Sequence, residues 1–531
     1  QTTRCHSHAH RARLRICISQ IRSVANLLRH GSRISSARTR HSKTASVHYE
    51  TMPSNQFKNK HVVVVGLGLL GGGVATTNWL LDHGARVTVT DLKNRDQLLP
   101  SVTKIEAHMK RVARDGASYE KMKASLSWEL GGHAEQLMDR ADIVVVNPDV
   151  SIRHALIARA LKRGVPVYNE GTLFFDAWSK PIIGVTGTRG KTTTATWTHH
   201  LIGSSVLTGN SVVKPFCAAL DERSHATHAI AELSSFVLEL FPYASAVPRI
   251  AVITNLHRDH LNRHRTMDEY AAAKANIFSH QTSRDHLIVN ADNEWTERFL
   301  SREPASAVHQ VSMSPLLVGV MGAWYEDGAI VHRTKKGTSV ALALPGFLEQ
   351  WGEHNVRNLL CASLAAHLAG TSWDAIQRKI ATLPQVQYRQ EPVYRDAQLT
   401  IINDTTATSP EGGIVALRRW GGPNCILICG GTDRDLAYHE WAREVRAHIR
   451  RTNLVFLSGT ATRKMRASLG VFARGVRAYD NLEAAVSAAR SRACTYVHAV
   501  ILFSPSAKSF ELFANEFDRG QQFNVLVARS T

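Results

Sequence analysis

The sequence lacks any long hydrophobic run. No apolar stretch approaches the roughly 20 residues that an α-helix needs to cross a bilayer. Hydrophobic residues make up 44% of the chain and charged residues 20%, which is ordinary for a globular protein. We therefore expect no membrane-spanning segment and no membrane partner.

Cysteine is scarce, and its spacing does not suit a metal site. The seven cysteines are scattered along 531 residues. Cys425 and Cys429, in CILICGG, are spaced for one face of a buried strand and do not form a C-x-x-C pair. This usage predicts reduced thiols in a cytoplasmic protein without a zinc site.

The first 51 residues almost lack acidic and aromatic side chains. They hold ten lysines or arginines against one acid, Glu50, and supply +9 of the net charge of +20. Such a segment does not fold alone. It resembles an organellar transit peptide in part, but Met52 stands directly before the first segment that should fold. We expect residues 1–51 to be a disordered basic leader outside the working protein.

The remaining length predicts three α/β domains, which we place at residues 52–168, 169–384 and 385–531. A chain of this size is too long for one hydrophobic core. In the last unit, strand, loop and helix alternate three times, beginning at CILICGG, NLVFLSG and AVILFSP. That alternation predicts a parallel sheet with helices on both faces. The milder basic charge of these units suits anionic substrates, although a solvated surface explains it equally well. We expect no nucleic-acid partner.

A glycine-rich turn follows the first apolar strand, HVVVV. Gly66, Gly68 and Gly71 fit G-x-G-x-x-G, and Asp91 lies 20 residues further along, at the end of the next strand. This arrangement is typical of nucleotide binding, with phosphates at a helix N-terminus and the carboxylate on a sugar hydroxyl. A turn that only packs helix on sheet is the alternative. An oxidoreductase interpretation depends on this motif alone.

A second glycine loop, in IIGVTGTRGKTTT, departs from the usual phosphate-binding loop. The pattern G-x-x-x-x-G-K-[ST] requires glycine at position 185, where the chain has Val185. The strand before the loop and the helix after it still direct backbone N–H groups and a helix dipole at an anion. Lys191 would reach the β- and γ-phosphates, and Thr192 would ligate Mg²⁺. The loop therefore predicts ATP binding.

Three polar residues further along are informative only as a set. Glu232, in AELSSF, offers carboxylate oxygens to a hard cation. His260, in NLHRDHLNRH, suits a metal or a substrate contact, although a lone histidine is more often structural. Lys274, in AAAKANIF, lies on a predicted helix, where a solvated lysine is the ordinary interpretation.

Five segments, taken in order, resemble the Mur ligases, the ATP-dependent amino-acid-adding enzymes of peptidoglycan synthesis. They are GVTGTRGKTTT, AELSSF, TNLHRDHLNRH, AAAKANIF and GEHNVRNLLCA. The loop of that family is typically T-G-T-N-G-K-T-T, so Arg189 stands where asparagine is usual. IINDTTATSPEG resembles the N-D-S-K-A-T-N segment of the D-glutamate-adding branch, and the signatures of the other branches are absent. The resemblance extends from about residue 60 to the C-terminus.

The resemblance implies both a fold and a reaction. It implies a Rossmann-like UDP-binding domain, a central P-loop ATPase-type α/β domain and a C-terminal Rossmann-like α/β domain. ATP would phosphorylate the carboxylate of UDP-N-acetylmuramoyl-L-alanine. The amine of D-glutamate would then attack the acyl phosphate, giving an amide, ADP and phosphate. Closure of the third domain over the second would exclude water from the acyl phosphate.

Residue roles also follow from the resemblance. Lys191 would stabilise the transferred phosphoryl group, Thr192 and Glu232 would hold one Mg²⁺, and carbamylated Lys274 with His260 would hold a second. The implied ATP contacts are Gly187, Thr188, Arg189, Gly190, Lys191, Thr192, Thr193, Asn358, Arg389 and Asp404. The implied contacts to the UDP-linked substrate are Gly68, Leu69, Leu70, Asp91, Asn210 and His260. The implied contacts to the amino acid are Thr408, Arg434 and Ser509, and we add Lys508 as a further candidate at this site.

The departures from the family pattern gather in the amino-acid site. Thr406 stands where the D-glutamate-adding branch has lysine, and Lys508 is a cation that the branch lacks at its position. We hypothesise that Lys508 replaces the lost positive charge. Two alternatives stay open: a ligase of the same fold that adds another amino acid, and a catalytically decayed nucleotide-binding homologue. We expect a monomer.

Overall fold

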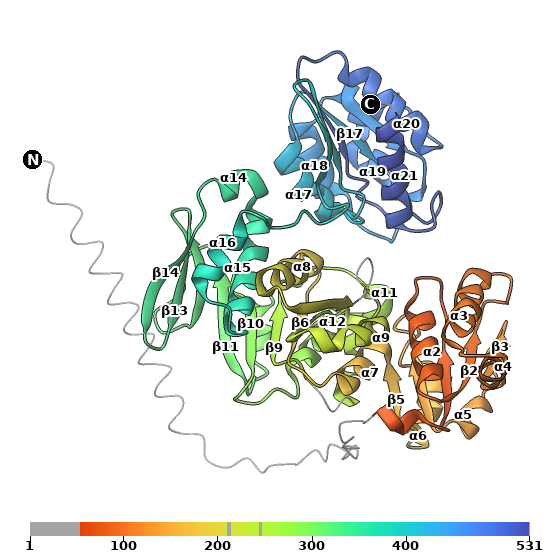
Figure 1. Ribbon diagram of the computed structural model, residues 1–531. Helices are drawn as coiled ribbons and strands as arrows, with labels where there is room; N and C mark the ends of the chain where they lie inside the picture. The colour runs from red at the N-terminus through yellow and green to blue at the C-terminus, as the bar shows by residue number, and fades with distance from the viewer. Residues whose placement is uncertain (1–53, 210–213, 244–246, 530–531) are drawn as a thin grey trace, which may run out of the picture. The chain divides into compact units, whose positions relative to one another are not determined.

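The computed structural model describes residues 54–529 except 210–213 and 244–246. The basic leader, residues 1–51, lies outside this range. The chain forms three separate sheets, drawn from residues 61–169, 182–343 and 391–503 (Figure 1). This confirms the predicted α/β class with three sheets. The exact domain boundaries at 168 and 384 remain a proposal.

The first sheet is entirely parallel, with strand order β3-β2-β1-β4-β5. Its central strand β1 is the run of valines, and four of its five residues are buried. The chain leaves β1 toward β2 and later returns to β4 on the other side, so the carboxyl ends of β1 and β4 frame a crevice. The elements are η1 (Ser54–Phe57), β1 (His61–Val65), α2 (Gly72–Asp82), β2 (Arg86–Asp91), α3 (Leu99–Val112), α4 (Gly116–Ala124), β3 (Leu126–Leu130), α5 (Leu137–Arg140), β4 (Ile143–Val146), α6 (Ala155–Lys162), β5 (Val167–Asn169) and α7 (Glu170–Ala177).

The second sheet has nine strands in the order β14-β13-β12-β11-β10-β9-β6-β8-β7. It is parallel from β7 to β12 and antiparallel at the edge formed by β13 and β14. The elements are β6 (Ile182–Thr186), α8 (Lys191–Ile202), β7 (Ser205–Gly209), α9 (Phe216–Ala219), η2 (Leu220–His225), β8 (His228–Glu232), α10 (Ser235–Leu238), η3 (Phe241–Tyr243), β9 (Ile250–Ile253), α11 (Leu261–His264), α12 (Met267–Ala275), η4 (Asn276–Phe278), β10 (His286–Asn290), α13 (Thr296–Leu300), β11 (Ala307–Ser312), β12 (Gly322–Glu326), β13 (Ala329–Thr334), β14 (Gly337–Ala343), α14 (Phe347–Trp351), α15 (Glu353–Leu368) and α16 (Trp373–Ile380).

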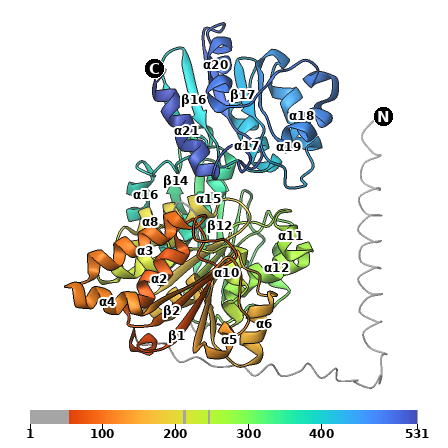
Figure 2. The same ribbon diagram turned by 90° about the vertical axis from the view of Figure 1, so that its right-hand side faces the viewer.

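The third sheet has six strands in the order β15-β16-β20-β17-β18-β19, and only the β15–β16 pair is antiparallel. Helices α20 and α21 cover one face, and α17, α18 and α19 cover the other (Figure 2). The elements are β15 (Glu391–Arg395), β16 (Leu399–Asn403), α17 (Pro410–Trp420), β17 (Cys425–Cys429), α18 (His439–His448), η5 (Arg451–Asn453), β18 (Leu454–Leu457), α19 (Thr460–Leu469), η6 (Gly470–Ala473), β19 (Ala478–Tyr479), α20 (Leu482–Ala493), β20 (Ala499–Phe503) and α21 (Glu516–Arg529).

Strand β17 shows why its sequence is apolar at every position. Cys425 and Cys429 pack on the α17–α19 side with Leu427, whereas Ile426 and Ile428 pack on the opposite side. Both cysteines are free thiols, and burial raises the pKa of the Cys425 thiol to about 12. The prediction of two cysteines on one face of a buried strand is confirmed.

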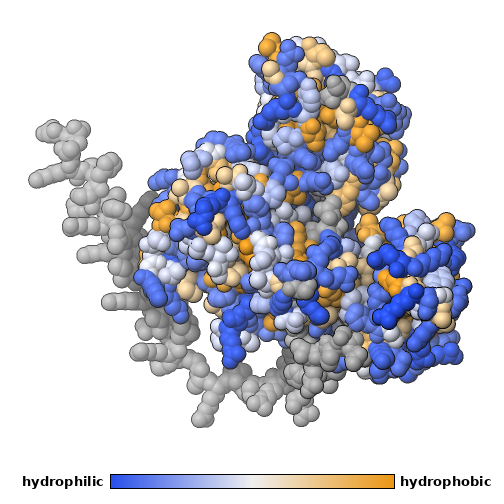
Figure 3. Space-filling model, viewed as in Figure 1, coloured by the Kyte–Doolittle hydropathy of each residue, from blue (hydrophilic) through white to orange (hydrophobic). Residues whose placement is uncertain are grey.

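Hydrophilic side chains cover most of the surface in the view of Figure 3, and hydrophobic ones are scattered among them. Among the helices of the described chain, none is both long and apolar enough to cross a membrane.

Candidate active site

The loop residues of the predicted ATP site lie at the carboxyl edge of three neighbouring strands in the second sheet. Strand β6 lies between β8 and β9, with Val185 in register with Glu232 and Thr186 in register with Ile253. The loop after β6, the end of β8 and the segment after β9 therefore emerge together. In parallel α/β sheets, this edge is where ligands bind.

The loop after β6 needs glycine at two positions. Gly187 has φ of 148°, and a Cβ there would lie 1.9 Å from the hydroxyl oxygen of Thr254. Gly190 has φ of 80°, and a Cβ there would lie 2.3 Å from the side-chain oxygen of Asn358. Asn358 thus lies against the loop, and its side-chain amide donates to Asn355, 3.0 Å away. A larger residue at either glycine would push the loop off its neighbours.

Asn255, which the sequence analysis did not single out, holds the loop in place. Its backbone oxygen accepts from the N–H of Thr188 at 3.0 Å, and its side-chain oxygen accepts from the N–H of Arg189 at 2.9 Å. The hydroxyl of Thr254 donates to the Arg189 carbonyl at 2.6 Å. These bonds use two loop donors and leave the N–H groups of the first turn of α8, which have no partner within the helix, for an anion.

Lys191 and Thr192 open helix α8 directly after the loop. The Lys191 amine donates to the Thr188 carbonyl at 3.2 Å, and the guanidinium of Arg389 donates to the Thr192 hydroxyl at 3.0 Å. Burial lowers the pKa of Lys191 to about 8, while the Glu232 carboxylate acts in the opposite direction. A bound triphosphate would favour the charged amine. Thr193, the next residue of the helix, is buried.

Lys274 reaches the same loop from helix α12. Its side chain is 1% exposed, and its amine donates to the Gly187 carbonyl at 2.8 Å and lies 4.8 Å from the centre of the Tyr270 ring. Burial, with the nearby charge of Lys191, lowers the pKa of Lys274 well below that of a solvated lysine. A lowered pKa favours the neutral amine, which is the form that reacts with CO₂. A solvated lysine, the ordinary interpretation, is wrong here.

Glu232 and His260 each present an unsatisfied buried atom. Oxygen Oε2 of Glu232 and nitrogen Nδ1 of His260 are buried without a hydrogen-bond partner in the described structure. Burial lowers the pKa of His260 to about 3, although the Asp259 carboxylate opposes this effect. A neutral imidazole nitrogen and a free carboxylate oxygen are suitable metal ligands.

The described residues contain no group of three or more His, Cys, Asp or Glu side chains placed to hold a metal ion. Magnesium, however, is usually bound by one or two carboxylates together with substrate phosphates and water. Glu232 and the Thr192 hydroxyl, beside a triphosphate loop, fit such a site. Unpaired Nδ1 of His260 and a carbamate on Lys274 would fit a second one.

The glycine turn of the first domain is held by Asp91. Gly66, Gly68 and Gly71 all have positive φ. Oxygen Oδ2 of Asp91 accepts from the N–H groups of Leu67, at 2.9 Å, and Gly68, at 3.2 Å. Asp91 thus shapes the turn, a role that the sequence analysis did not assign to it. The side chains of Leu69 and Leu70 are exposed beside the turn, and Asn210 lies outside the described residues.

Asp404 is buried at the end of strand β16. It accepts hydrogen bonds from the Gln390 N–H at 3.1 Å and the Ser504 hydroxyl at 2.7 Å. Burial raises the pKa of Asp404 to about 7. Gln390 follows Arg389, so Asp404 lies close to the chain segment that carries the Thr192 contact.

The predicted amino-acid contacts lie on neighbouring loops of the third sheet. Thr432 and Lys508 exchange backbone hydrogen bonds, which places the loop of Arg434 beside that of Ser509. The buried Ser509 hydroxyl has no hydrogen-bond partner in the described part of the chain. The half-buried Thr408 immediately precedes helix α17 and its N-cap residue.

The charge of Lys508 is not free. Its amine lies 3.0 Å from Oε1 of Glu516, and burial lowers its pKa while Glu516 raises it. The local sequence does not predict this pairing, because nothing in its pattern indicates that α21 begins beside this loop. Lys508 would meet a substrate carboxylate as half of an ion pair.

Arg189 joins the phosphate loop to the third domain. Its guanidinium lies 3.1 Å from the Asp259 carboxylate and donates to the hydroxyl of Ser409. Arg434 lies 4.0 Å from the other oxygen of Asp259. Asp259 was missed by the sequence analysis although it directly precedes His260.

Comparison with known proteins agrees with this geometry. The chain is 34% identical over 489 residues to UDP-N-acetylmuramoylalanine–D-glutamate ligase of Roseiflexus sp., which covers 90% of this chain and 100% of that protein. The chain belongs to the Mur ligase family. The same enzyme of Geobacillus kaustophilus is 31% identical, covering 89% of this chain and 98% of its own.

Family models place the likeness in two domains of this Mur ligase. The model of the Mur ligase MurD-like N-terminal domain matches residues 60–169, and that of the Mur ligase middle domain matches residues 185–366. The fold is similar to the crystal structure of MurF from Acinetobacter baumannii, with a TM-score of 0.53 at 14% identity over 90% of this chain and 92% of that one. The family predicted from the sequence motifs is confirmed.

Proposed function

We propose that this Mur ligase adds D-glutamate to UDP-N-acetylmuramoyl-L-alanine in peptidoglycan synthesis, with ATP converted to ADP and phosphate. The observation that carries the proposal is the meeting of Lys191, Glu232, His260 and Lys274 at one edge of the second sheet. Val185 of β6 is in register with Glu232, and the Lys274 amine donates to the Gly187 carbonyl. The Tyr270 ring lies 5.9 Å from the His260 ring and 4.8 Å from the Lys274 amine, so these two side chains contact the same tyrosine. The identity of the two substrates is inferred from the relatives, which are UDP-N-acetylmuramoylalanine–D-glutamate ligases.

The first step transfers a phosphoryl group. A carboxylate oxygen of the UDP-linked substrate attacks the γ-phosphorus, the bond to the ADP oxygen breaks, and an acyl phosphate forms. Two anions must approach each other, so positioned cations contribute most of the stabilisation. Lys191 and the first-turn N–H groups of α8 hold the phosphates, and Arg389 orients the Thr192 hydroxyl.

The second step forms the amide. The neutral amine of D-glutamate attacks the acyl carbon, and the tetrahedral intermediate collapses. Inorganic phosphate leaves with the electron pair of the broken C–O bond and takes up the proton that the nitrogen loses. Arg434, Thr408, Ser509 and Lys508 would hold the amino acid. The hydroxyl of Ser509, which is buried and unpaired, is suited to a substrate oxygen.

Magnesium would be held by Thr192 and Glu232 at one position and by His260 and carbamylated Lys274 at a second. Bound there, it would neutralise charge on the transferring phosphoryl group. We further propose that the protein acts in the cytoplasm. We also propose that it is a monomer, which light scattering after gel filtration would test.

The reaction is tested with purified protein, UDP-N-acetylmuramoyl-L-alanine, ATP and a panel of amino acids. We expect phosphate release and a product with the mass of the D-glutamate adduct, and no product with L-glutamate. Product with a different amino acid would move the assignment to another ligase of the same fold. ATP binding without any product would contradict the proposal.

A further inference from the structure

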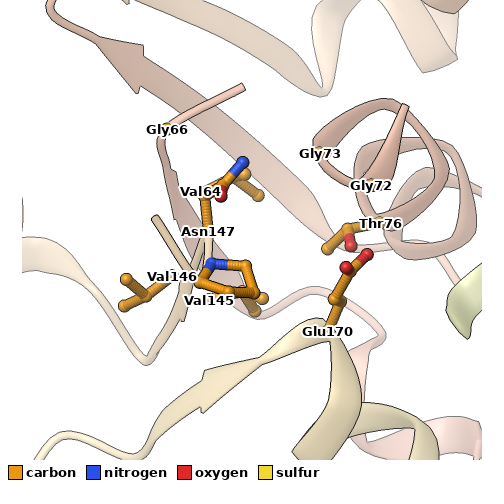
Figure 4. Close-up of a pocket in the computed structure, with 10 residues that line it drawn as sticks. Val64, Gly66, Gly72, Gly73, Thr76, Val145, Val146, Asn147 and Glu170 are labelled. Carbon is orange, nitrogen blue, oxygen red and sulfur yellow. The ribbon is translucent and has the colours of Figure 1, made fainter. Parts of the chain in front are cut away.

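A buried carboxylate directly after the last strand of the first sheet has no role in the proposed mechanism. Glu170 is the first residue of α7 and is 8% exposed, and its Oε2 atom has no hydrogen-bond partner in the described structure. Figure 4 shows its carboxylate directed toward Thr76 and the start of α2. No ion pair with a described lysine or arginine compensates it. Burying an ionised acid without a partner costs free energy, which binding of a hydrogen-bond donor or of a proton would reduce.

The carboxylate touches the first turn of helix α2. A Cβ on Gly72 would lie 2.5 Å from Oε2 of Glu170, so the helix begins directly against the acid. The first N–H groups of α2 have no partner within the helix and, with its dipole, attract an anion. Glu170 and an incoming phosphate therefore compete for the same end of α2.

Glu170 lines a small cavity. A cavity lined by Gly66, Gly72, Thr76, Asn147 and Glu170 lies beneath the glycine turn and has room for about one water molecule. Glu170 and the glycine turn therefore line the same cavity, and a ligand bound at the turn would lie close to the Glu170 carboxylate.

The groups that face Glu170 are few. Helix α2 contributes Gly72, Gly73 and Thr76, none of which titrates. The loop after β4 contributes Asp149, whose charge raises the pKa of Glu170. Helix α9 contributes the buried thiol of Cys217, whose pKa is raised by burial and by the charge of Glu170. Burial, and then the charge of Asp149, raise the pKa of Glu170 to about 7.

We propose that Glu170 takes up a proton when the diphosphate of the UDP-linked substrate occupies the N-terminus of α2. Glu170 is then a positioning residue that couples substrate binding to protonation. The ionised carboxylate repels the diphosphate, whereas the protonated acid removes that repulsion and offers an O–H donor. The inference rests on the proposed function, because it needs a diphosphate substrate at this turn.

The test is calorimetry of the full chain with UDP-N-acetylmuramoyl-L-alanine and no ATP, so that no turnover occurs. The phosphates of this substrate are diesters and do not titrate near neutral pH, so proton exchange reports the protein. Titrations in buffers of different ionisation enthalpy give the number of protons taken up. We expect uptake approaching about one proton above pH 7 and little below about pH 6, with Kd rising up to about tenfold per pH unit above pH 7.

The variant Glu170→Gln keeps the shape of the side chain but cannot ionise. We expect it to bind the substrate with no proton uptake and with a Kd that does not change with pH. Asp149→Asn is the matched control, since it removes the neighbouring charge and keeps Glu170. It should retain proton uptake but shift its onset to lower pH.

Two results would overturn the inference. One is binding by the unmodified protein without proton uptake, and the other is uptake of equal size in Glu170→Gln, which would mean that Glu170 holds only water. Failure of the substrate to bind at all, while ATP still binds, would instead contradict the proposed function.

Discussion

The amine of Lys274 donates a hydrogen bond of 2.8 Å to the carbonyl oxygen of Gly187, across 87 residues of sequence. This contact fixes a buried lysine against the loop that we propose holds the phosphates of ATP. It places a group that could carry a carbamate beside the loop that we propose binds ATP.

Lys274 should make activity depend on CO₂. Because burial lowers the pKa of the amine and so favours its neutral form, we expect it to react with CO₂ and to supply a carboxylate. Degassed, bicarbonate-free enzyme should release phosphate more slowly, and added bicarbonate should restore the rate. Lys274→Arg keeps a cation and cannot form the carbamate, so it should stay inactive with or without bicarbonate. A rate independent of bicarbonate in the unmodified protein would contradict this role.

Lys191→Met should lower kcat by about 100-fold or more, because it removes the cation nearest the transferring phosphoryl group. The measurement is the initial rate of phosphate release at saturating substrates. Lys379→Met is the control, since that amine donates to the carbonyls of His200 and Leu201 at the other end of α8. It should lower the unfolding temperature and leave kcat near the unmodified value. An equal loss of kcat in both variants would mean that the effect comes from a disturbed helix α8 and not from the charge of Lys191.

Arg189→Asn restores the usual family residue and removes the bridge to Asp259 and Ser409. The ion pair is only partly buried, with side chains 31% and 11% exposed. Its contribution to the free energy of the contact is therefore modest. We expect KM for D-glutamate to rise about two- to fivefold. Arg298→Asn, which breaks the exposed pair with Asp268, serves as the control and should leave KM unchanged. A fall in KM would show that Arg189 hinders the closed state.

Lys508 and Glu516 should be coupled in stability and separable in function. Removing either partner leaves a largely buried charge, so each alanine variant should lose about 1–3 kcal/mol of unfolding free energy. The double variant should lose less than the sum. If Lys508 replaces the missing lysine, KM for D-glutamate should rise strongly in Lys508→Ala and in the double variant, and little in Glu516→Ala. An unchanged KM in Lys508→Ala rejects the replacement hypothesis.

Histidines packed on the second sheet should make the fold sensitive to acid. Burial, with neighbouring histidines, lowers the pKa of His309 and of His332 to about 4, from 6.5. The unfolded chain therefore binds protons that the folded chain does not, and the free energy of unfolding falls as pH drops from 6.5 toward 4. Thermal unfolding across this range measures the effect. His309→Gln should flatten the curve, whereas His225→Gln, at an exposed position, should not.

Local sequence was enough for the chemistry that short segments carry. The valine run of β1, the glycines of both loops and the order of the polar motifs indicated α/β domains, a phosphate loop and the family. Period-two burial likewise placed Cys425 and Cys429 on one face. These signals are local because strand pleat, positive φ and helix dipole depend on neighbouring residues.

What only the tertiary structure decided is which atoms are satisfied and which are left over. The sequence gives no sign that Glu516 pairs with Lys508, that Asp91 is used by its own glycine turn, or that Asn255 and Asp259 hold the phosphate loop and Arg189. It equally hides the unpaired Oε2 of Glu170. Such pairings depend on how separate chain segments pack, and burial then fixes the charge state of each group, so they appear only when the folded chain is complete.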